Sequence, residues 1–406
     1  MDILTTVANA VGLVVKLFGA YYFLIGVFAL LRRAKPTPAA PKTRFAVIVP
    51  ARNEEAVIGN LIESLLKQNY PAELFDVYAA INNCTDKTAL RASQAGAKVF
   101  SCYGEVRCKG DALNQSLEYL MGVDPQYDAF CVFDADNLVD SNFLFEMNSA
   151  FVNGAKVAKG RNEAKNPYDS WISGCYAIYF RMANFLYNSA RANLGLSARL
   201  VGTGFAIHRS VLMQLGGWHT HTLTEDAEFA AICAEHGIKV VWVPQALAYD
   251  EEPNELSVSL RQRKRWCSGM VEVARAKLPD VCRSMRKKHK GLKFDSIMFQ
   301  LNSFIQAIAF VPMLINLGIA VLPHITSDEI ILIFAQLLLA YAGGVALAAA
   351  ISLISGDWDA RIAKSVFAYP IFLATWLPLQ LLAIIHTTQS WEEIRHNRGI
   401  SIQELA

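Results

Sequence analysis

The distribution of apolar residues constrains this chain more than any other feature of its sequence. One long apolar stretch opens it at residues 3–31, and three more close it at about 297–322, 330–354 and 362–385. Each is longer than the roughly 20 residues that a helix needs to cross a bilayer. The sequence therefore predicts an N-terminal transmembrane anchor at 1–33, a water-facing domain at 43–292, C-terminal transmembrane helices at 297–387 and a short tail at 388–406.

Basic residues orient this arrangement. Arg and Lys cluster at 32–35, after the first stretch, and again at 283–293, before the C-terminal stretches. Because cytoplasmic flanks carry the excess of Lys and Arg, we expect a multi-pass protein of the cell membrane with its large domain in the cytoplasm. The side of the tail stays open, since two prolines interrupt the last stretch while two arginines of the tail favour the cytoplasm. The net charge of +2 gives no reason to expect nucleic acid as a partner, whereas membrane lipids are expected.

Within residues 43–292, short apolar runs alternate with segments of helical period. Strands are predicted at 45–49, 75–81, 97–100 and 129–133, and helices at about 53–66, 86–95 and 109–120. This alternation predicts an α/β fold with a mostly parallel sheet covered on both faces. Ligands of such sheets bind beyond the carboxyl ends of the strands. A further aromatic segment, 168–196, predicts an amphipathic helix at the membrane interface, with a buried core helix as the alternative.

Two pairs of acids are the first candidate site residues. Asp134 and Asp136 follow a predicted buried strand, and strand alternation points both to one side. Two carboxylates so close repel unless a cation lies between them, and hard oxygen ligands suit Mg²⁺ or Mn²⁺. Glu225 and Asp226 precede a predicted helix at 227–235, where an acid can either cap the helix or deprotonate an acceptor hydroxyl.

Basic, aromatic and glycine-rich segments complete the candidates. Arg265 suits diphosphate oxygens, and Trp266 offers an indole ring on which a sugar can stack. Lys109 begins a predicted helix, where backbone N–H groups attract anions. The Gly-Thr-Gly segment at 202–204 either lets the backbone approach a ligand closely or forms a tight turn.

This ordered set of motifs resembles the family 2 glycosyltransferases with a GT-A fold. It is most similar to the membrane-embedded, processive synthases that make cellulose, hyaluronan and chitin-type oligosaccharides. The resemblance covers about residues 43–270 and the flanking apolar helices. It implies a GT-A nucleotide-sugar-binding domain, Mg²⁺ or Mn²⁺ as cofactor, a UDP-sugar as donor, and inverting transfer to a growing polysaccharide.

The resemblance also implies roles for individual residues. The acid at Asp226 would be the general base, with Glu225 beside it. Asn82 departs from the family, which usually has an aspartate in this segment. The residues implied for nucleotide-sugar binding are Pro50, Ala51, Arg52, Glu54, Asn82, Asp86, Lys109, Asp134 and Arg265; those for the metal are Asp134 and Asp136; those for the acceptor are Gly202, Thr203, Gly204, Gln262 and Trp266.

Two other functions fit the same motifs. The first is the transfer of a single sugar to a membrane lipid, as in ceramide-type glucosyltransferases. The small number of candidate membrane helices favours it, because a polymer pore needs many. The second is a scaffold that binds a nucleotide sugar without turnover, and Asn82 alone supports it. The sequence does not indicate the sugar, the linkage, the product length or the oligomeric state.

Overall fold

The structure is a computed structural model that describes residues 2–31, 37–123, 127–310, 312, 315, 326–355, 358–386 and 398–405. Its largest feature is an eight-stranded sheet in the order β3-β2-β1-β4-β7-β6-β8-β5. The strands β1, β2, β3 and β4 pair in parallel, as do β6 and β8, whereas β7 and β5 pair antiparallel to their neighbours. The strands are β1 Phe45–Ala51, β2 Phe75–Ile81, β3 Lys98–Ser101, β4 Ala129–Val132, β5 Leu138–Val139, β6 Val157–Ala164, β7 Phe205–His208 and β8 Val240–Asp250.

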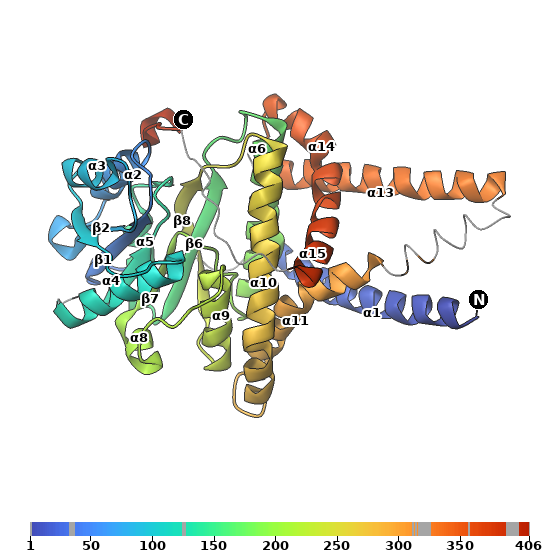
Figure 1. Cartoon of the computed structure of the whole chain (residues 1–406), viewed down its shortest axis with the longest axis horizontal. Helices are drawn as coiled ribbons and strands as arrows, with labels where there is room; N and C mark the ends of the chain where they lie inside the picture. The colour runs from blue at the N-terminus through green and yellow to red at the C-terminus, as the bar shows by residue number, and fades with distance from the viewer. Residues whose placement is uncertain are drawn as a thin grey trace.

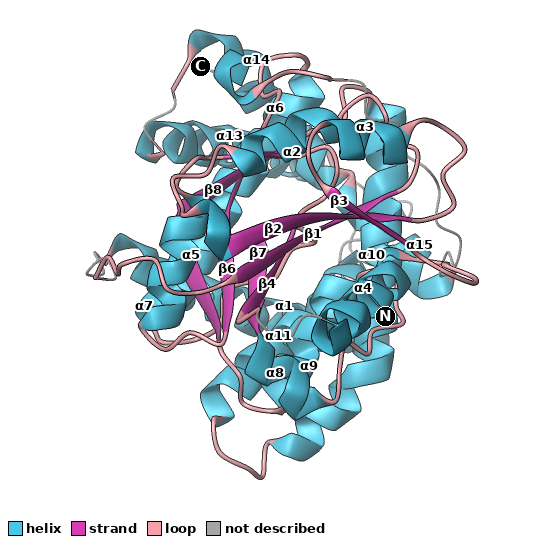
Figure 2. Cartoon of the chain, turned by 90° about the vertical axis from the view of Figure 1, so that its left-hand side faces the viewer, coloured by secondary structure: helices cyan, strands magenta, loops and turns pink. Residues whose placement is uncertain are grey.

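Helices cover both faces of this sheet (Figure 2). The central strand β1 is buried along its whole length, and its side chains alternate between two hydrophobic clusters. One cluster packs β1 against α2 Ile58–Leu66, α3 Thr88–Gln94 and α5 Phe143–Val152. The other packs it against α4 Lys109–Val123, α8 Arg209–Leu215 and α9 Glu225–Glu235. The predicted α/β fold is confirmed, and its four predicted strands match β1 to β4 within two residues at each end.

Two long helical segments connect the sheet to the apolar C-terminal helices. The first is α6 Trp171–Met182, which continues through a π-helical turn at Ala183–Ser189 into α7 Ala190–Asn193. The second is α10 Leu256–Ser284. The helix α14 Ala363–Ala374 packs against α6, and α15 Trp376–Ile385 packs against α10 (Figure 1). The segment predicted at 168–196 is therefore mostly the core-helix alternative, since α6 is buried between β6 and α14; its place relative to a membrane stays a prediction.

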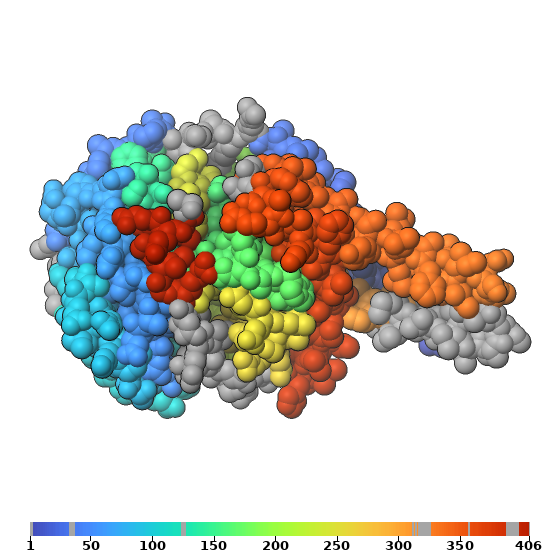
Figure 3. Space-filling model, turned by 90° about the horizontal axis from the view of Figure 1, so that it is seen from above, coloured from blue at the N-terminus to red at the C-terminus, as the bar shows by residue number. Residues whose placement is uncertain are grey.

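Three segments of the described chain are long and apolar enough to cross a membrane: Ile3–Leu30, Ser327–Ile354 and Ala360–Ile385. Figure 1 shows α1 Asp2–Val27 and α13 Ser327–Ile354 projecting away from the sheet domain, and Figure 3 shows the projection of α13 from above. The predicted span at 297–322 is not among the three. Its first part belongs to α11 Lys290–Ile308, and most of its remainder lies outside the described residues, as does the basic flank at 32–35.

The described part of the tail, 398–405, returns to the sheet domain (Figure 3). The backbone N–H of Arg398 donates to the carboxylate of Glu251 at 3.2 Å, and its guanidinium pairs with Asp169. A Cβ added to Gly399 would lie 2.9 Å from the carbonyl oxygen of Ala56, so the tail touches the start of α2 as well. In the described ranges, the short 3₁₀ turns are Phe28–Leu30, Ala72–Leu74, Ala360–Ile362 and Ile402–Leu405.

Candidate active site

A cavity of about 290 Å³ lies beyond the carboxyl ends of β1, β4 and β8. These three strands run in the same direction, so their carboxyl ends meet at one edge of the sheet. Helices α4, α9 and α10 supply further walls, together with the end of α6, the π-helical turn after it and the segment 199–203. The cavity therefore occupies the position at which α/β sheets bind their ligands.

The first acid pair follows β4 in a tight turn. The backbone N–H of Asp134 donates to Asn137 Oδ1 and to Thr203 Oγ1, both at 3.1 Å, which leaves the Asp134 side chain 39% exposed. Asp136 is buried, and its Oδ2 accepts from the backbone N–H of Glu251 at 3.3 Å. Both carboxylates line the cavity.

These two carboxylates fit a divalent cation only in part. Carboxylate oxygens are the ligands that Mg²⁺ and Mn²⁺ prefer. Among the residues that the structure describes, however, no group of three or more His, Cys, Asp or Glu side chains is placed to hold a metal ion. A cation at Asp134 and Asp136 would therefore need further oxygens from a ligand such as a diphosphate.

Lys109 links the two acid pairs. It is the first residue of α4, and its Nζ donates to Asp134 Oδ1 at 2.5 Å and to the carbonyl oxygen of Gly202. The same Nζ lies 3.5 Å from Glu225 Oε1. Burial alone would lower the pKa of Lys109, but the surrounding carboxylates outweigh it and hold the pKa above its ordinary value. The ammonium is therefore charged throughout the physiological range and neutralises part of the acidic wall.

The second acid pair lies at the first turn of α9. Burial raises the pKa of Glu225 to about 7, although Lys109 opposes that shift. Burial also raises the pKa of Asp226 above its ordinary value of 3.8, while the N–H of Ala227, at 2.7 Å from Asp226 Oδ1, lowers it. Thr224 occupies the N-cap position of α9, but its side chain makes no capping bond.

Three predicted residues share one face of α10. Gln262, Arg265 and Trp266 are spaced at helical period and line the cavity. Gln262 Oε1 accepts from the hydroxyl of Tyr176 at 2.9 Å, and the Trp266 ring lies edge-on to the Tyr176 ring at 6.1 Å. The indole of Trp266 also stacks at 6.2 Å on Trp376 of α15, which connects the cavity to the C-terminal helices.

Most of the predicted site is brought together. The predicted residues that line the cavity are Pro50, Ala51, Arg52, Glu54, Asn82, Lys109, Asp134, Asp136, Gly202, Thr203, Glu225, Asp226, Gln262, Arg265 and Trp266.

Two predicted residues do not line it. Asp86 accepts hydrogen bonds from the N–H of Thr88 at 3.0 Å and of Glu55 at 3.2 Å, so it supports the start of α3. Gly204 has a φ of +62°. Its backbone N–H donates to the carbonyl oxygen of Val132, and its carbonyl oxygen accepts from the N–H of Gly160. Both residues therefore have structural roles, and their binding roles stay predictions.

Asn82 lies on the cavity wall with its side chain tied to the backbone. Its Nδ2 donates to the carbonyl oxygen of Ala51 at 3.2 Å. An ionised aspartate at this position would bring a carboxylate toward that carbonyl without a proton between them. The asparagine therefore fits the local hydrogen bonding better than the aspartate that the resembled family usually has here.

Sequence reasoning missed a buried polar group beneath the first acid pair. Lys159 of β6 is 1% exposed, and burial lowers its pKa to about 7 although Asp250 opposes the shift. Asp250 accepts from Asn162 Nδ2 at 2.7 Å and from Asn137 Nδ2 at 3.0 Å, and burial raises its pKa to about 8. The sequence did carry a signal for this group. Asp250, Glu251 and Glu252 follow a mostly apolar run, as Asp134 and Asp136 do.

The sheet order, the two acid pairs and the basic, aromatic face of α10 define the GT-A class of glycosyltransferases. The chain belongs to the family described as glycosyltransferase like family 2, whose model matches residues 41–269. The fold comparison agrees: a mannosyltransferase from Pyrobaculum calidifontis, solved in complex with GDP-Man and Mn²⁺, aligns with a TM-score of 0.63 over 90% of this chain and 98% of that chain, at 17% identity.

Curated relatives include lipid and polysaccharide enzymes. The probable glycosyltransferase YdaM of Bacillus subtilis is 27% identical over 64% of this chain and 63% of its own length. The beta-monoglucosyldiacylglycerol synthase of a Nostoc strain is 29% identical over 66% of this chain and 57% of its own length. The cellulose synthase catalytic subunit of Xanthomonas axonopodis is 23% identical over 74% of this chain and 41% of its own length. The chain thus spans less than two thirds of the length of each of these relatives.

Proposed function

We propose that the chain transfers a hexose from a nucleotide sugar, with a UDP-sugar as the first candidate, to a growing polysaccharide at the cytoplasmic face of the membrane. The observation that carries this proposal is the convergence of two acid pairs, Lys109 and the Gln262–Trp266 face of α10 on one cavity. Such a cavity holds donor, base and acceptor surface within reach of one another, which is what a direct displacement requires.

The proposed reaction is an inverting displacement. Asp226 takes the proton of an acceptor hydroxyl, and that oxygen attacks the anomeric carbon on the side opposite the nucleotide. The bond from that carbon to the diphosphate breaks, and Lys109 and Arg265 stabilise the charge that develops on the leaving group. Bound Mg²⁺ or Mn²⁺, held by Asp134 and Asp136, would offset the charge of the donor diphosphate.

The acceptor side supports a glycan. Trp266 and Tyr179 line the cavity, and both stack on Trp376 of α15, at 6.2 Å and 5.7 Å between ring centroids. Aromatic faces of this kind suit the apolar faces of sugar rings. The ring cluster extends from the cavity toward the apolar C-terminal helices, so a growing chain placed there would leave the cavity on the membrane side.

A membrane lipid is the second candidate acceptor. It is favoured by the higher identity to the beta-monoglucosyldiacylglycerol synthases, 28–30%, than to the cellulose synthases, 23–24%. The exposed apolar surfaces of α1 and α13 would then hold the lipid chains beside the cavity.

One product analysis distinguishes these acceptors. The full chain in native membranes is supplied with radiolabelled UDP-glucose or UDP-N-acetylglucosamine and Mn²⁺, and the label is separated into solvent-extractable lipid and insoluble or gel-resolved glycan. A ladder of glycans with β-linked sugars supports the polysaccharide proposal. A single sugar on an extractable lipid replaces it with the lipid proposal, and an α-linked product overturns the inverting mechanism.

A further inference from the structure

The carboxylate of Glu252 is a buried group of the cavity that the proposed mechanism does not use. Glu252 follows β8 by two residues, lines the cavity and is only 4% exposed. No described residue donates a hydrogen bond to its side chain, and its hydrogen bonds to Asn166 involve only its backbone. Burial raises its pKa well above the ordinary value, and the neighbouring acids Asp250, Asp136 and Glu251 raise it further. A buried carboxylate without a partner is costly, so its position calls for a ligand.

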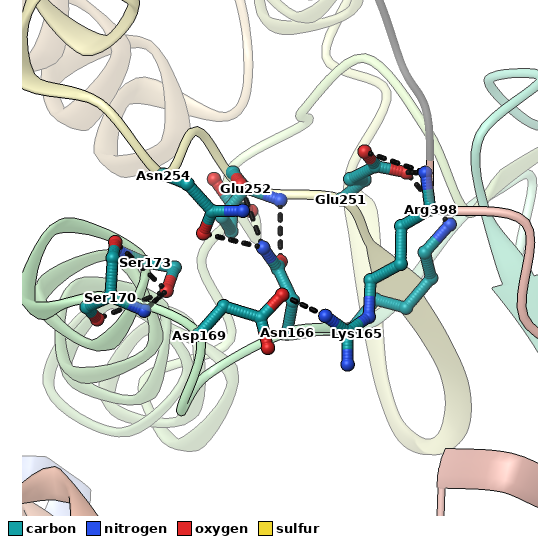
Figure 4. Close-up of polar contacts among 9 residues, drawn as sticks. All are labelled: Lys165, Asn166, Asp169, Ser170, Ser173, Glu251, Glu252, Asn254 and Arg398. Carbon is teal, nitrogen blue, oxygen red and sulfur yellow. Dashed lines mark hydrogen bonds and ion pairs between the residues drawn. The ribbon is translucent and has the colours of Figure 1, made fainter.

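The backbone beneath this carboxylate is firmly held (Figure 4). The buried side chain of Asn166 accepts from the N–H of Glu252 at 2.8 Å and donates to its carbonyl oxygen at 2.9 Å. The same amide nitrogen donates to Asn254 Oδ1 at 3.1 Å. Beside it, Lys165 Nζ pairs with Glu251 at 3.0 Å, so the next carboxylate is satisfied while that of Glu252 is not. A side chain carried on so fixed a backbone is preorganised for binding.

The surroundings define the chemistry of the missing partner. The charged groups that act on Glu252 are all acidic, so no protein cation compensates it. Glu252 also acts electrostatically on Tyr176, whose hydroxyl donates a hydrogen bond to Gln262. Glu252 therefore lies between the first acid pair and the acceptor face of α10. The fitting partner is a neutral donor of hydrogen bonds, and a sugar presents such hydroxyls in adjacent pairs.

We propose that Glu252 is a specificity-determining residue whose carboxylate accepts hydrogen bonds from hydroxyl groups of a sugar bound in the cavity. This inference rests on the proposed function and deepens it. The sugar belongs either to the donor or to the end of the acceptor, because both meet between Asp136 and Gln262. Two hydroxyls on one carboxylate form charge-assisted bonds, which discriminate a sugar from an analogue that lacks a hydroxyl.

The test compares Glu252→Gln with the wild-type full chain in detergent. Nucleotide release is measured from UDP-glucose, UDP-N-acetylglucosamine and their single-deoxy analogues, first without acceptor and then with the purified product of the wild-type enzyme as acceptor. We expect kcat/KM for the preferred sugar to fall by roughly ten- to a hundredfold. We also expect one deoxy analogue to have a low kcat/KM with the wild-type protein. Glu252→Gln should lower the kcat/KM for that analogue only slightly further, because the hydroxyl that Glu252 would bind is already absent. A loss without acceptor assigns the hydroxyls to the donor, and a loss only with acceptor assigns them to the acceptor.

The matched control is Glu255→Gln, an exposed acid of the same loop that does not line the cavity, which should leave kcat/KM unchanged. Because Glu252→Gln removes a buried charge, its melting temperature should equal or exceed that of the wild type; if it falls, Glu252→Asp, which keeps the charge, provides the same comparison. If the wild type is active and the Glu252 variants keep its kcat/KM and its discrimination between sugars, this inference is wrong while the proposed function stands. A wild-type protein that releases nucleotide from no donor overturns the proposed function and this inference with it.

Discussion

At the scale of single residues, the site is an arrangement of acids whose repulsion is limited by Lys109. Its ammonium contacts Asp134 from β4 and lies near Glu225 from α9, so it fixes the distance between the proposed metal-binding and base-bearing walls. Such a cation in a buried site acts on its neighbours far more strongly than a surface lysine does. We therefore expect Lys109 to organise the site in addition to contacting the donor.

Replacement of Lys109 by Met tests this role. We expect kcat/KM for the donor to fall by about a hundredfold or more, because two carboxylates lose their cation and the leaving diphosphate loses a positive charge. Lys67→Met is the control, since that lysine forms only an exposed pair with Glu63. Equal activity of the two variants would contradict the organising role.

The pH dependence follows from the buried second acid pair. Asp226 must be ionised to accept a proton, and burial raises its pKa above 3.8. Because the neutral form is inactive as a base, kcat/KM should fall as pH falls, with an apparent pKa above 3.8 that belongs to Asp226 and Glu225 together. A profile measured on the free protein that stays flat down to pH 4 would argue against Asp226 as the base.

At the scale of elements, the sequence predicts the sheet core well and its far half poorly. The first four strands are apolar runs with helices between them, so hydrophobic pattern alone finds them. By contrast, β6 carries Lys159, Arg161 and Asn162, and β5 has only two residues, so neither has a strand's apolar pattern. The buried polar group formed by Lys159 and Asp250 was missed because its two members lie on different strands, β6 and β8, whose pairing is not evident from the sequence.

The site residues divide along a similar line. Short motifs on one element, such as Asp134 with Asp136 or Gln262 with Trp266, could be predicted because their spacing along a strand or helix places their side chains on the same side. The structural roles of Asp86 and Gly204 could not, because they depend on Glu55 and Val132, which the sequence does not pair with them.

Asp86 provides a stability prediction for α3. Because its carboxylate accepts from the N–H of Thr88 at the helix start, Asp86→Ala should lower the free energy of unfolding by about 1 kcal/mol. Since Asp86 does not line the cavity, the KM for the donor should stay within about twofold of the wild-type value. Denaturant unfolding and donor kinetics measure the two effects separately; a large rise in KM with unchanged stability would restore the binding role that the sequence predicts.

One of the contacts that hold the N-terminal helix α1 against the domain is a hydrogen bond to a buried ion pair. Arg191 of α7 forms two bonds of 2.9 Å to Asp295 of α11, and the Tyr21 hydroxyl of α1 donates to the same carboxylate at 2.7 Å. We expect Asp295→Ala to lower the free energy of unfolding by about 3–5 kcal/mol, because it leaves a buried guanidinium unpaired. Asp280→Ala, which breaks the exposed pair with Arg283, should cost less than about 1 kcal/mol. Similar melting temperatures for the two variants would show that α1 is not held in this way.

At the scale of the whole molecule, a family 2 glycosyltransferase domain is attached to apolar helices through α6 and α10. The exposed apolar faces of α1 and α13 are on the side away from the sheet, as a lipid bilayer requires (Figure 1). The side chain of Arg263 on α10 donates to the carbonyl oxygen of Phe372 at 3.1 Å and to Thr375 at 2.7 Å, so the helix that bears Trp266 is also bonded to the C-terminal helices. The site and the membrane segments therefore form one connected structure.

The central claim is that this cavity transfers a sugar from a nucleotide donor, and nucleotide release tests it most directly. The detergent-purified full chain is given UDP-glucose, UDP-N-acetylglucosamine, UDP-glucuronate, UDP-galactose and GDP-mannose in turn, with Mg²⁺ or Mn²⁺, beside Asp226→Asn as the control. We predict release with at least one donor, loss of that release on chelation of the metal, and a rate in Asp226→Asn lower by about 10²–10⁴-fold. Release that is equal in the wild type and in Asp226→Asn, or no release with any donor, would contradict this claim.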